Sequence, residues 1–478
     1  MSRVSRTGRA AFVYLLLAGL QRGVSLLILP FITHAMSPAQ FGAASVLTAT
    51  ALLLVAVIAA PLEQLVFRAS ARGGDGADSL IRAVGFYCYI ALPLIAASAA
   101  GPVALFVPEV FGIGGTIWAI ELVAIGFQPA ATYFALPFVR AHQDIRRFAW
   151  LALTSVLVTA ASKILFVVVW RLDVLGWALS DLISGLLSAL LAIAMVRLPK
   201  AKVTTKHIKE MLRFSIPLIP HRASFWALLS LNRPAMAMVS SLSQVGLLSF
   251  GLNLAAVATM IIAEIQQAVL PHYSRESLPA PNDETRGPVR WQLMVAVTVP
   301  ALVGAGLAVA GHWIFSEAYW PSFALTGLLL CGQVAYGLYL VPMNYLVQTA
   351  GLPKFSALAS LSGAIVILAG IFAFGNRFGA FGVACATALG FVLMSLVALT
   401  LTRVLGVTIH WGCWRDSWPE LTIGTAGLAF SVAALFLPIG SPAAYSTAVT
   451  CVGLVAAALV IASRRAPGGP RQPKHRRA

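Results

Sequence analysis

The sequence predicts an all-α polytopic membrane protein with about fourteen transmembrane helices: two six-helix lobes in a parallel pseudo-twofold repeat, and two extra C-terminal helices. Three observations carry this prediction: an apolar composition, apolar runs long enough to span a bilayer, and motifs that recur along the chain. Of the 478 residues, 59% are hydrophobic and only 10% are charged. Soluble domains average about 45–50% apolar and about 25% charged residues, so the composition excludes a soluble enzyme.

The apolar runs define the predicted spans, because a transmembrane helix needs about 20 consecutive apolar residues. Helices rather than strands are expected, since backbone exposed to lipid must satisfy its own hydrogen bonds and the runs show no alternation. The predicted spans are 10–31, 43–66, 81–107, 115–139, 148–170, 174–196, 211–232, 244–270, 290–312, 321–347, 355–375, 378–402, 419–438 and 443–463.

The basic residues provide a separate test of this topology. When the loops are assigned to alternate sides, 27 of the 33 lysines and arginines fall on the side of both termini, and only Arg171, Arg233 and Arg377 fall in the opposite loops. Cytoplasmic loops carry an excess of Lys and Arg, so both termini are predicted to be cytoplasmic. The net charge of +17 then needs no nucleic acid, because such charges set topology and contact anionic lipid head groups.

Motifs recur at offsets of 204 to 207 residues. The stretch 171–178 (RLDVLGWA) recurs as 377–384 (RFGAFGVA), and Ser37–Gly42 corresponds to Ser243–Gly246. Parallel repeats of this kind build transporters whose site lies between the halves. The predicted organisation is an N-lobe (1–196), a basic cytoplasmic linker (197–213), a C-lobe (214–405), two further helices (406–463) and a basic cytoplasmic tail (464–478).

Three basic residues fall inside predicted spans, where a charge costs about 2.5–3.5 kcal/mol on insertion scales and normally faces a cavity or a partner. Arg22 and Arg222 occupy equivalent places in the first helix of each lobe, and Lys163 lies in the fifth span. Two guanidinium groups in one cavity repel each other unless an anion is present, and a phosphate offers the bidentate acceptor that arginine fits. The sequence predicts a cationic site for a diphosphate; structural ion pairs with nearby carboxylates are the alternative.

Other polar residues in the spans suggest further roles. Glu264, Asp181 and Glu121 are candidates for binding a coupling proton or sodium ion, because desolvated carboxylates titrate near neutrality; salt bridges are the alternative. Gln333, Tyr336 and Asn344 in the tenth span are candidate sugar contacts, with core packing as the alternative. Neither a catalytic constellation nor a metal or cofactor site is predicted, and the five cysteines lack the spacing of a zinc or redox motif.

The ends of several predicted helices resemble a known family. Residues 30–42 (PFITHAMSPAQFG) resemble the motif that closes the first helix of bacterial polysaccharide-transport flippases, which belong to the multidrug/oligosaccharidyl-lipid/polysaccharide (MOP) exporter superfamily. Residues 212–220, 243–246 and 271–273 are similar to motifs of the family's second half. Asn232 stands before Arg233 where the family usually has an aspartate.

The resemblance implies a V-shaped pair of lobes with a cationic cavity that flips a polyprenyl-diphosphate-linked oligosaccharide. Transport would run by alternating access from the cytoplasmic to the periplasmic leaflet of the bacterial inner membrane, for lipopolysaccharide or exopolysaccharide synthesis. The implied partners are this lipid-linked substrate, membrane lipids, and a polysaccharide polymerase with its chain-length machinery. Two alternatives stay open: a cation-coupled multidrug exporter of the same superfamily, and a membrane-embedded polymerase or acyltransferase, which the short outer loops disfavour.

Overall fold

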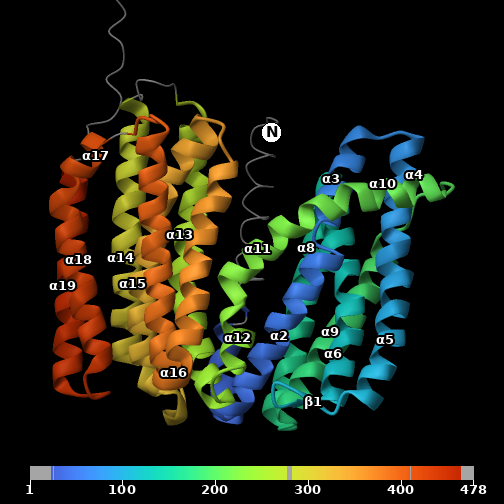
Figure 1. Ribbon diagram of the computed structural model, residues 1–478, viewed down its shortest axis with the longest axis horizontal. Helices are drawn as coiled ribbons and strands as arrows, with labels where there is room; N and C mark the ends of the chain where they lie inside the picture. Colours follow the sequence, from blue (N-terminus) through green and yellow to red (C-terminus); the bar gives the residue numbers. More distant parts are fainter. Residues whose placement is uncertain (1–22, 25, 277–282, 410, 465–478) are drawn as a thin grey trace, which may run out of the picture. The chain divides into compact units, whose positions relative to one another are not determined.

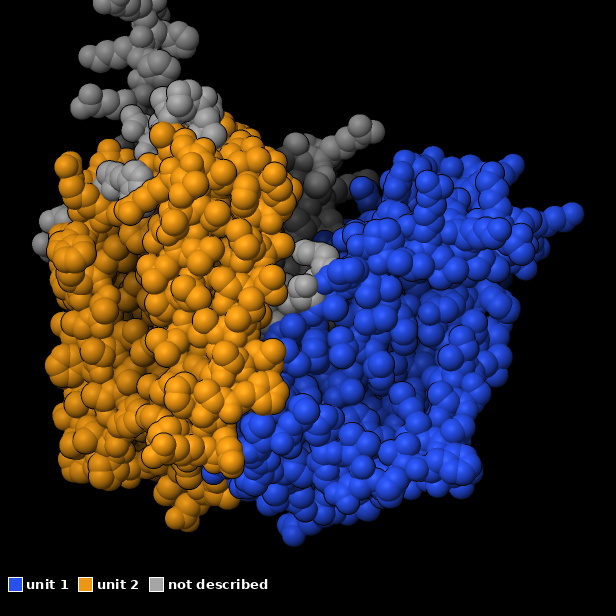
Figure 2. Space-filling view, in the orientation of Figure 1, with its two compact units in different colours: residues 1–249 blue, residues 250–478 orange. Residues whose placement is uncertain are grey.

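The computed structural model describes residues 23–24, 26–276, 283–409 and 411–464. The chain divides into two compact units, Met1–Ser249 and Phe250–Ala478 (Figure 2). Both are built almost entirely of helices (Figure 1). Eleven helices of the described residues are long and apolar enough to cross a membrane. The predicted class, an all-α polytopic membrane protein, is confirmed.

The described part of the first unit begins with a short apolar helix, Leu26–Ala35. Its later helical elements include three π-helical turns, η1, η2 and η3, each continuous with a neighbouring α-helix. In order, the elements are α2 (Pro38–Ile58), α3 (Leu62–Arg72), α4 (Asp75–Phe86), η1 (Tyr87–Ala91), α5 (Leu92–Phe106), β1 (Glu109–Val110), β2 (Ile113–Gly114), α6 (Gly115–Pro129), η2 (Ala130–Ala135), α7 (Leu136–Ala141), α8 (Ile145–Lys163), η3 (Ile164–Val169), α9 (Asp173–Met195), α10 (Thr205–Ser215), η4 (Ile216–Leu218), α11 (Ile219–Ser230) and α12 (Asn232–Ala237).

The start of α2 shows how the sequence fixes a helix boundary. Ser37 is the N-cap: its hydroxyl accepts a hydrogen bond from the backbone N–H of Gln40, and the Gln40 side chain accepts one from the backbone N–H of Ser37. Pro38 occupies the first helical position, where its missing N–H costs nothing. This reciprocal capping box satisfies backbone donors that a helix start otherwise leaves unpaired.

A small hairpin, β1–β2, connects α5 to α6 and was not anticipated from the sequence. Its two-residue turn, Phe111–Gly112, has positive φ at both positions, 53° and 72°. Positive φ at both turn residues matches the twist of a tight hairpin. The indole of Trp118 donates a hydrogen bond to the Val110 carbonyl and ties the hairpin to α6.

The predicted seventh span, 211–232, is not one continuous α-helix, so this detail of the prediction was wrong. It is divided among the end of α10, the 3-10 turn η4, α11 and the first residue of α12. Pro217 lies at the start of η4 and Pro220 at the start of α11. Proline lacks a backbone donor and clashes with the preceding turn, which accounts for the interruptions.

The second unit consists of helices and short helical turns in its described part. The long helix α13 begins in the first unit and ends in the second. The elements are α13 (Leu242–Ser274), α14 (Asp283–Ile314), η5 (Glu317–Tyr319), α15 (Pro321–Asn344), η6 (Tyr345–Thr349), α16 (Lys354–Val404), α17 (Trp411–Asp416), α18 (Trp418–Phe436) and α19 (Pro442–Arg464).

The last two spanning helices, α18 and α19, pack together and against α14 (Figure 1). Two ion pairs also reach α14: Glu420 of α18 pairs with Arg290, and Asp416 of the preceding short helix α17 pairs with Arg286. The Glu420 side chain is almost wholly buried. The two helices that follow the predicted repeat are therefore fixed to the second unit by both packing and charge.

The number of spans remains a prediction. Helix α16 covers two predicted spans, 355–375 and 378–402, and is two helices joined at a kink, since Gly379 has non-helical φ and ψ. Most of the predicted first span lies outside the described residues. The predicted lobe boundaries at residues 196, 213 and 405 likewise stay predictions.

Candidate functional site

A charged side chain lies inside a spanning segment of the first unit, where α8 continues into η3. The ammonium group of Lys163 lies 2.9 Å from a carboxylate oxygen of Asp181 and donates a hydrogen bond of 3.3 Å to the Ser180 hydroxyl. It also lies 3.5 Å from the ring centre of Trp177. An ion pair and a cation–π contact together offset the loss of water around a buried cation. The sequence-predicted residues Lys163 and Asp181 thus meet.

Among the described residues, the ion-pair, hydrogen-bond and cation–π partners of Lys163 all lie on one face of α9. Trp177, Ser180, Asp181 and Ser184 follow the i, i+3, i+4, i+7 spacing that aligns side chains on a helix. The Ser180 hydroxyl donates to the Trp177 carbonyl, and the Ser184 hydroxyl donates to the Asp181 carbonyl. These local bonds orient the small polar side chains along the same face.

Glu121 of α6 is the third charged member of this group. Its side chain is 1% exposed, and one carboxylate oxygen, Oε2, has no hydrogen-bond partner among the described residues. Asp181 and Lys163 are the charged groups that act on it electrostatically. Buried polar atoms are nearly always paired, so an unpaired carboxylate oxygen beside a second carboxylate marks a place where a proton or a cation can bind.

Helix α2 connects this cluster to Arg222. Its Thr48 hydroxyl accepts a hydrogen bond of 3.0 Å from the Trp177 indole, and the carbonyl of the next residue, Ala49, accepts one of 2.7 Å from the indole of Trp226. Trp226 lies on α11, one helical turn after Arg222. Adjacent residues of α2 therefore hold both the helix that contacts Lys163 and the helix that carries Arg222.

Arg222 itself is half-buried. Its guanidinium makes no ion pair or hydrogen bond with another described residue. Glu63 and Arg222 are the charged groups that act on the hydroxyl of Tyr133 in η2. Arg22, the predicted counterpart of Arg222, lies outside the described residues, so the predicted arginine pair stays a prediction.

The candidate sugar contacts lie in the second unit, on α15. The buried Gln333 amide accepts a hydrogen bond of 2.6 Å from Thr259, and Asn344 is hydrogen-bonded to Gln266. Tyr336 stacks near Tyr339 and packs edge-on against Phe391. Gln333 and Asn344 thus already serve partners within this unit, and their role toward a sugar stays a prediction. Glu264 is half-buried on α13.

Sequence reasoning missed several members of these networks. In α13 it missed Gln266, which is buried and bonded to both Asn344 and Gln292, whereas the neighbouring Gln267 is exposed. The sequence analysis included Trp177 only as part of the recurring stretch 171–178 and gave it no role in the site. A tryptophan three residues before Ser180 and four before Asp181 shares their helix face, and this spacing was the available signal. No group of three metal-binding side chains occurs within the described ranges.

The fold and the buried charges define a multi-pass membrane protein whose polar networks lie between its spanning helices. The sequence model of the family described as polysaccharide biosynthesis protein matches residues 7–276, more than half of the chain. The chain belongs to this family. With the structural likenesses that follow, this confirms the resemblance to the MOP superfamily.

Solved structures share the fold at low sequence identity. The lipid II flippase MurJ in an inward closed conformation matches with a TM-score of 0.68 at 14% identity, over 96% of this chain and 98% of that chain. An inward-facing multidrug resistance transporter of the MATE family matches with a TM-score of 0.60 at 13% identity, over 80% and 94%. No curated protein sequence matches the chain significantly.

Proposed function

We propose that the protein is a flippase that moves a polyprenyl-diphosphate-linked oligosaccharide between the leaflets of the bacterial inner membrane by alternating access. The direction is from the cytoplasmic to the periplasmic leaflet, with both termini cytoplasmic. The observation that carries the proposal is a buried cation, Lys163, on a polar helix face of a chain from the polysaccharide biosynthesis family. A polymerase and chain-length machinery would act on the delivered product.

The proposed site matches the chemistry of two parts of the substrate, the diphosphate and the sugars. The diphosphate needs cations, which Lys163, Arg222 and the predicted Arg22 supply. The sugars need hydrogen-bonding groups, and the hydroxyls of Thr48, Ser180 and Ser184 lie near the charged cluster. A charge-assisted bond to phosphate is roughly twice as strong as a neutral hydrogen bond, so the cations would dominate affinity.

The ion pair of Lys163 suggests how binding couples to an ion. A diphosphate that reaches the ammonium group replaces Asp181 as its counterion. The released Asp181 then shares its surroundings with Glu121, and two neighbouring carboxylates without a cation cannot both stay ionised. One of them takes up a proton or binds sodium. Glu264 is a separate coupling candidate in the second unit.

The test is deletion of the gene in its host with leaflet-specific labelling of lipid-linked oligosaccharides. The deletion is complemented at matched membrane levels with wild type, Arg22→Ala, Arg222→Ala, Lys163→Gln or the control Arg146→Gln. Arg146 is a matched basic residue because it is exposed at the start of α8, away from the cluster. Cytoplasmic accumulation that wild type and the control relieve, but the three cavity variants do not, is expected.

A deletion strain without cytoplasmic accumulation would contradict the flippase. Relief by all three cavity variants would keep the flippase and remove these basic residues from its substrate site.

A second function, export of cationic drugs, is favoured by one observation. The described cluster holds two carboxylates, Asp181 and Glu121, around one ammonium group, and so has a negative balance. Efflux of a cationic dye from the deletion and complemented strains separates the two proposals. Dye retention in the deletion strain, with normal lipid-linked oligosaccharides, would select the drug exporter.

A further inference from the structure

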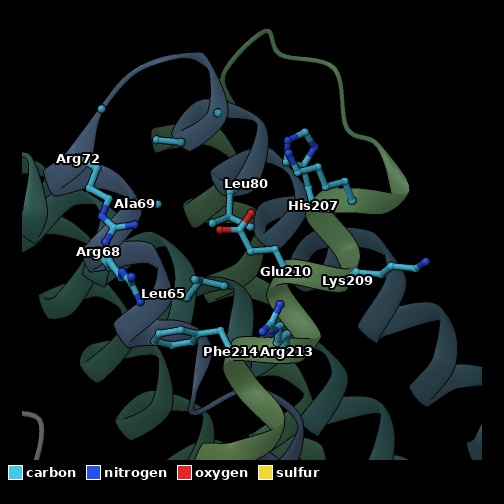
Figure 3. Close-up of a pocket in the computed structure, with 14 residues that line it drawn as sticks. Leu65, Arg68, Ala69, Arg72, Leu80, His207, Lys209, Glu210, Arg213 and Phe214 are labelled. Carbon is cyan, nitrogen blue, oxygen red and sulfur yellow. The ribbon is translucent and has the colours of Figure 1, made fainter.

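A basic pocket lies at one end of the first unit, away from the Lys163 cluster. It has a volume of about 740 Å³ and is lined by α3, by the start of α4 and by α10 (Figure 3). Arg68 and Arg72 form the wall on α3, and His207, Glu210 and Arg213 stand on the facing helix α10 (Figure 3). The volume falls in the range of small-molecule sites, about 300–1,000 Å³.

The charges of this pocket are out of balance. Five of its lining residues are basic, and Glu210 is its single acidic one. No ion pair within 4.0 Å joins Glu210 to Arg68, Arg72 or Arg213 in the part of the chain that the structure describes. Arg68 instead lies over the ring of Phe214, 5.8 Å from its centre. The basic residues lining the pocket are Arg68, Arg72, Lys206, Lys209 and Arg213.

Helix α10 is attached to the unit by one face only. Met211 is buried in the core cluster formed with residues of α3 and α4, and Phe214 packs against the same cluster. Just before the helix, the Ala201 carbonyl accepts a hydrogen bond of 2.8 Å from Arg82 of α4. The helix is therefore held across the ends of α3 and α4 (Figure 1).

The other face of α10 is apolar and uncovered. Ile208 and Leu212 of α10, and Ile216 at the start of the following turn η4, are 43%, 47% and 58% exposed and follow one another at four-residue spacing. Lys209 follows Ile208 and Arg213 follows Leu212, so positive charges lie along one side of this apolar stripe. A helix with an apolar stripe flanked by lysine and arginine lies in a membrane interface, with its apolar side in the acyl region.

We propose that this pocket binds the phosphate head group of an anionic phospholipid from the leaflet in which α10 lies. The apolar stripe brings the helix to the depth of the head groups, and Arg68, Arg72 and Arg213 converge on the adjacent cavity. Arginine presents paired N–H donors that match a phosphate, and each basic residue near an anionic surface contributes about 1 kcal/mol. This site is independent of the transport proposal, because it needs no lipid-linked sugar.

The experiment is native mass spectrometry of the purified full-length protein titrated with phosphatidylglycerol or phosphatidylcholine. Phosphatidylglycerol is expected to bind the wild type more tightly than phosphatidylcholine. Loss of two arginines in R68Q/R72Q should weaken phosphatidylglycerol binding about 10- to 30-fold, the equivalent of about 1 kcal/mol per residue. The control R146Q/R147Q removes the same charge from exposed residues outside the pocket and should change binding less than about 2-fold.

A variant of opposite sign separates a binding effect from poor folding. Glu210→Gln removes the single carboxylate of the pocket and should tighten phosphatidylglycerol binding. Equal losses in R68Q/R72Q and in the control, or weaker binding by Glu210→Gln, would overturn the proposal. Displacement of phosphatidylglycerol by millimolar inorganic phosphate would also overturn it, because the ligand would then be the soluble anion.

Discussion

Asp173 and Gly379 adopt the same unusual sign of φ, 51° and 55°, at positions 206 residues apart. Asp173 begins α9, and Gly379 forms the kink that divides α16. Three residues later in each case stands a glycine, Gly176 or Gly382, that packs closely on the residue just before the turn, Leu172 or Phe378. The two copies of this one motif, 171–178 and 377–384, thus share a backbone turn, while the six-helix repeat stays a prediction.

Gly379→Ala should destabilise the second unit. With φ 55° and ψ −139°, this residue occupies a region that is essentially restricted to glycine, and a side chain there costs about 1–3 kcal/mol. A lower melting temperature of the purified protein in detergent is the expected result.

Asp173→Ala is the matched comparison, because Asp173 already carries a Cβ at positive φ. It should cost less than Gly379→Ala. Equal losses at the two positions would contradict the assignment of the cost to backbone strain at the kink.

Gly42→Ala and Gly246→Ala should each disrupt the close packing between the start of α2 and the start of α13. A Cβ at Gly42 would overlap the Leu242 carbonyl, and a Cβ at Gly246 would overlap the Pro38 carbonyl. Backbone cannot move aside as a flexible side chain does, and overpacking costs about 1–3 kcal/mol. Thermal unfolding in detergent measures the loss. Gly306→Ala serves as the control, since nothing lies within 4 Å of its Cβ position; a similar loss there would show a general effect of alanine.

Lys163→Gln and Asp181→Asn should each lower stability, and the double variant should recover part of the loss. Each single change leaves the opposite charge without its partner 2.9 Å away. Breaking a fully buried pair costs about 3–5 kcal/mol, and these side chains are 12% and 14% exposed, so a smaller loss of about 2 kcal/mol is expected for each. A thermal double-mutant cycle gives the coupling, and strictly additive losses would show that the pair contributes nothing.

The spanning helices that the structure describes follow apolar runs of the sequence, because a membrane helix needs a long apolar run, while the number of spans stays a prediction. The second span was expected from residue 43, whereas α2 begins at Pro38, because Ser37, Pro38 and Gln40 satisfy helix-start donors by local bonds alone. The seventh span was expected as one apolar run, which Pro217 and Pro220 interrupt. The apolar composition of about 20 residues predicts a span, but it does not show where prolines interrupt the helix.

The charged cluster was predictable only in part. Lys163, Asp181 and Glu121 stood out because a charge inside an apolar span is costly and therefore has a partner or a function. The partner of each charged residue depends on how α6, α8 and α9 pack together. The spacing of residues within one helix does not predict that packing. The same limit explains why Gln266 was missed: its network joins side chains from three separate helices, α13, α14 and α15.

The buried amides of the second unit give a prediction that distinguishes a structural role of Asn344 from a role in sugar binding. Asn344 and Gln266 exchange hydrogen bonds, Gln292 donates to Gln266, and Tyr273 donates to Gln292 at 2.8 Å. Asn344→Leu removes one end of this chain: the Gln266 side-chain NH2 loses its acceptor, while the Gln266 carbonyl oxygen still accepts from Gln292. An unsatisfied buried amide costs about 1–3 kcal/mol, so the variant should unfold at a lower temperature. The exposed neighbour Gln267→Leu should not.

Transport at matched membrane levels then decides the role of Asn344. If Asn344 only holds the helices together, a second-site stabilising change that restores the melting temperature should also restore relief of the deletion strain. If Asn344 contacts the sugar, relief stays impaired after stability has recovered, because the lost amide is part of the binding surface. An Asn344→Leu variant with wild-type stability would contradict the structural network itself.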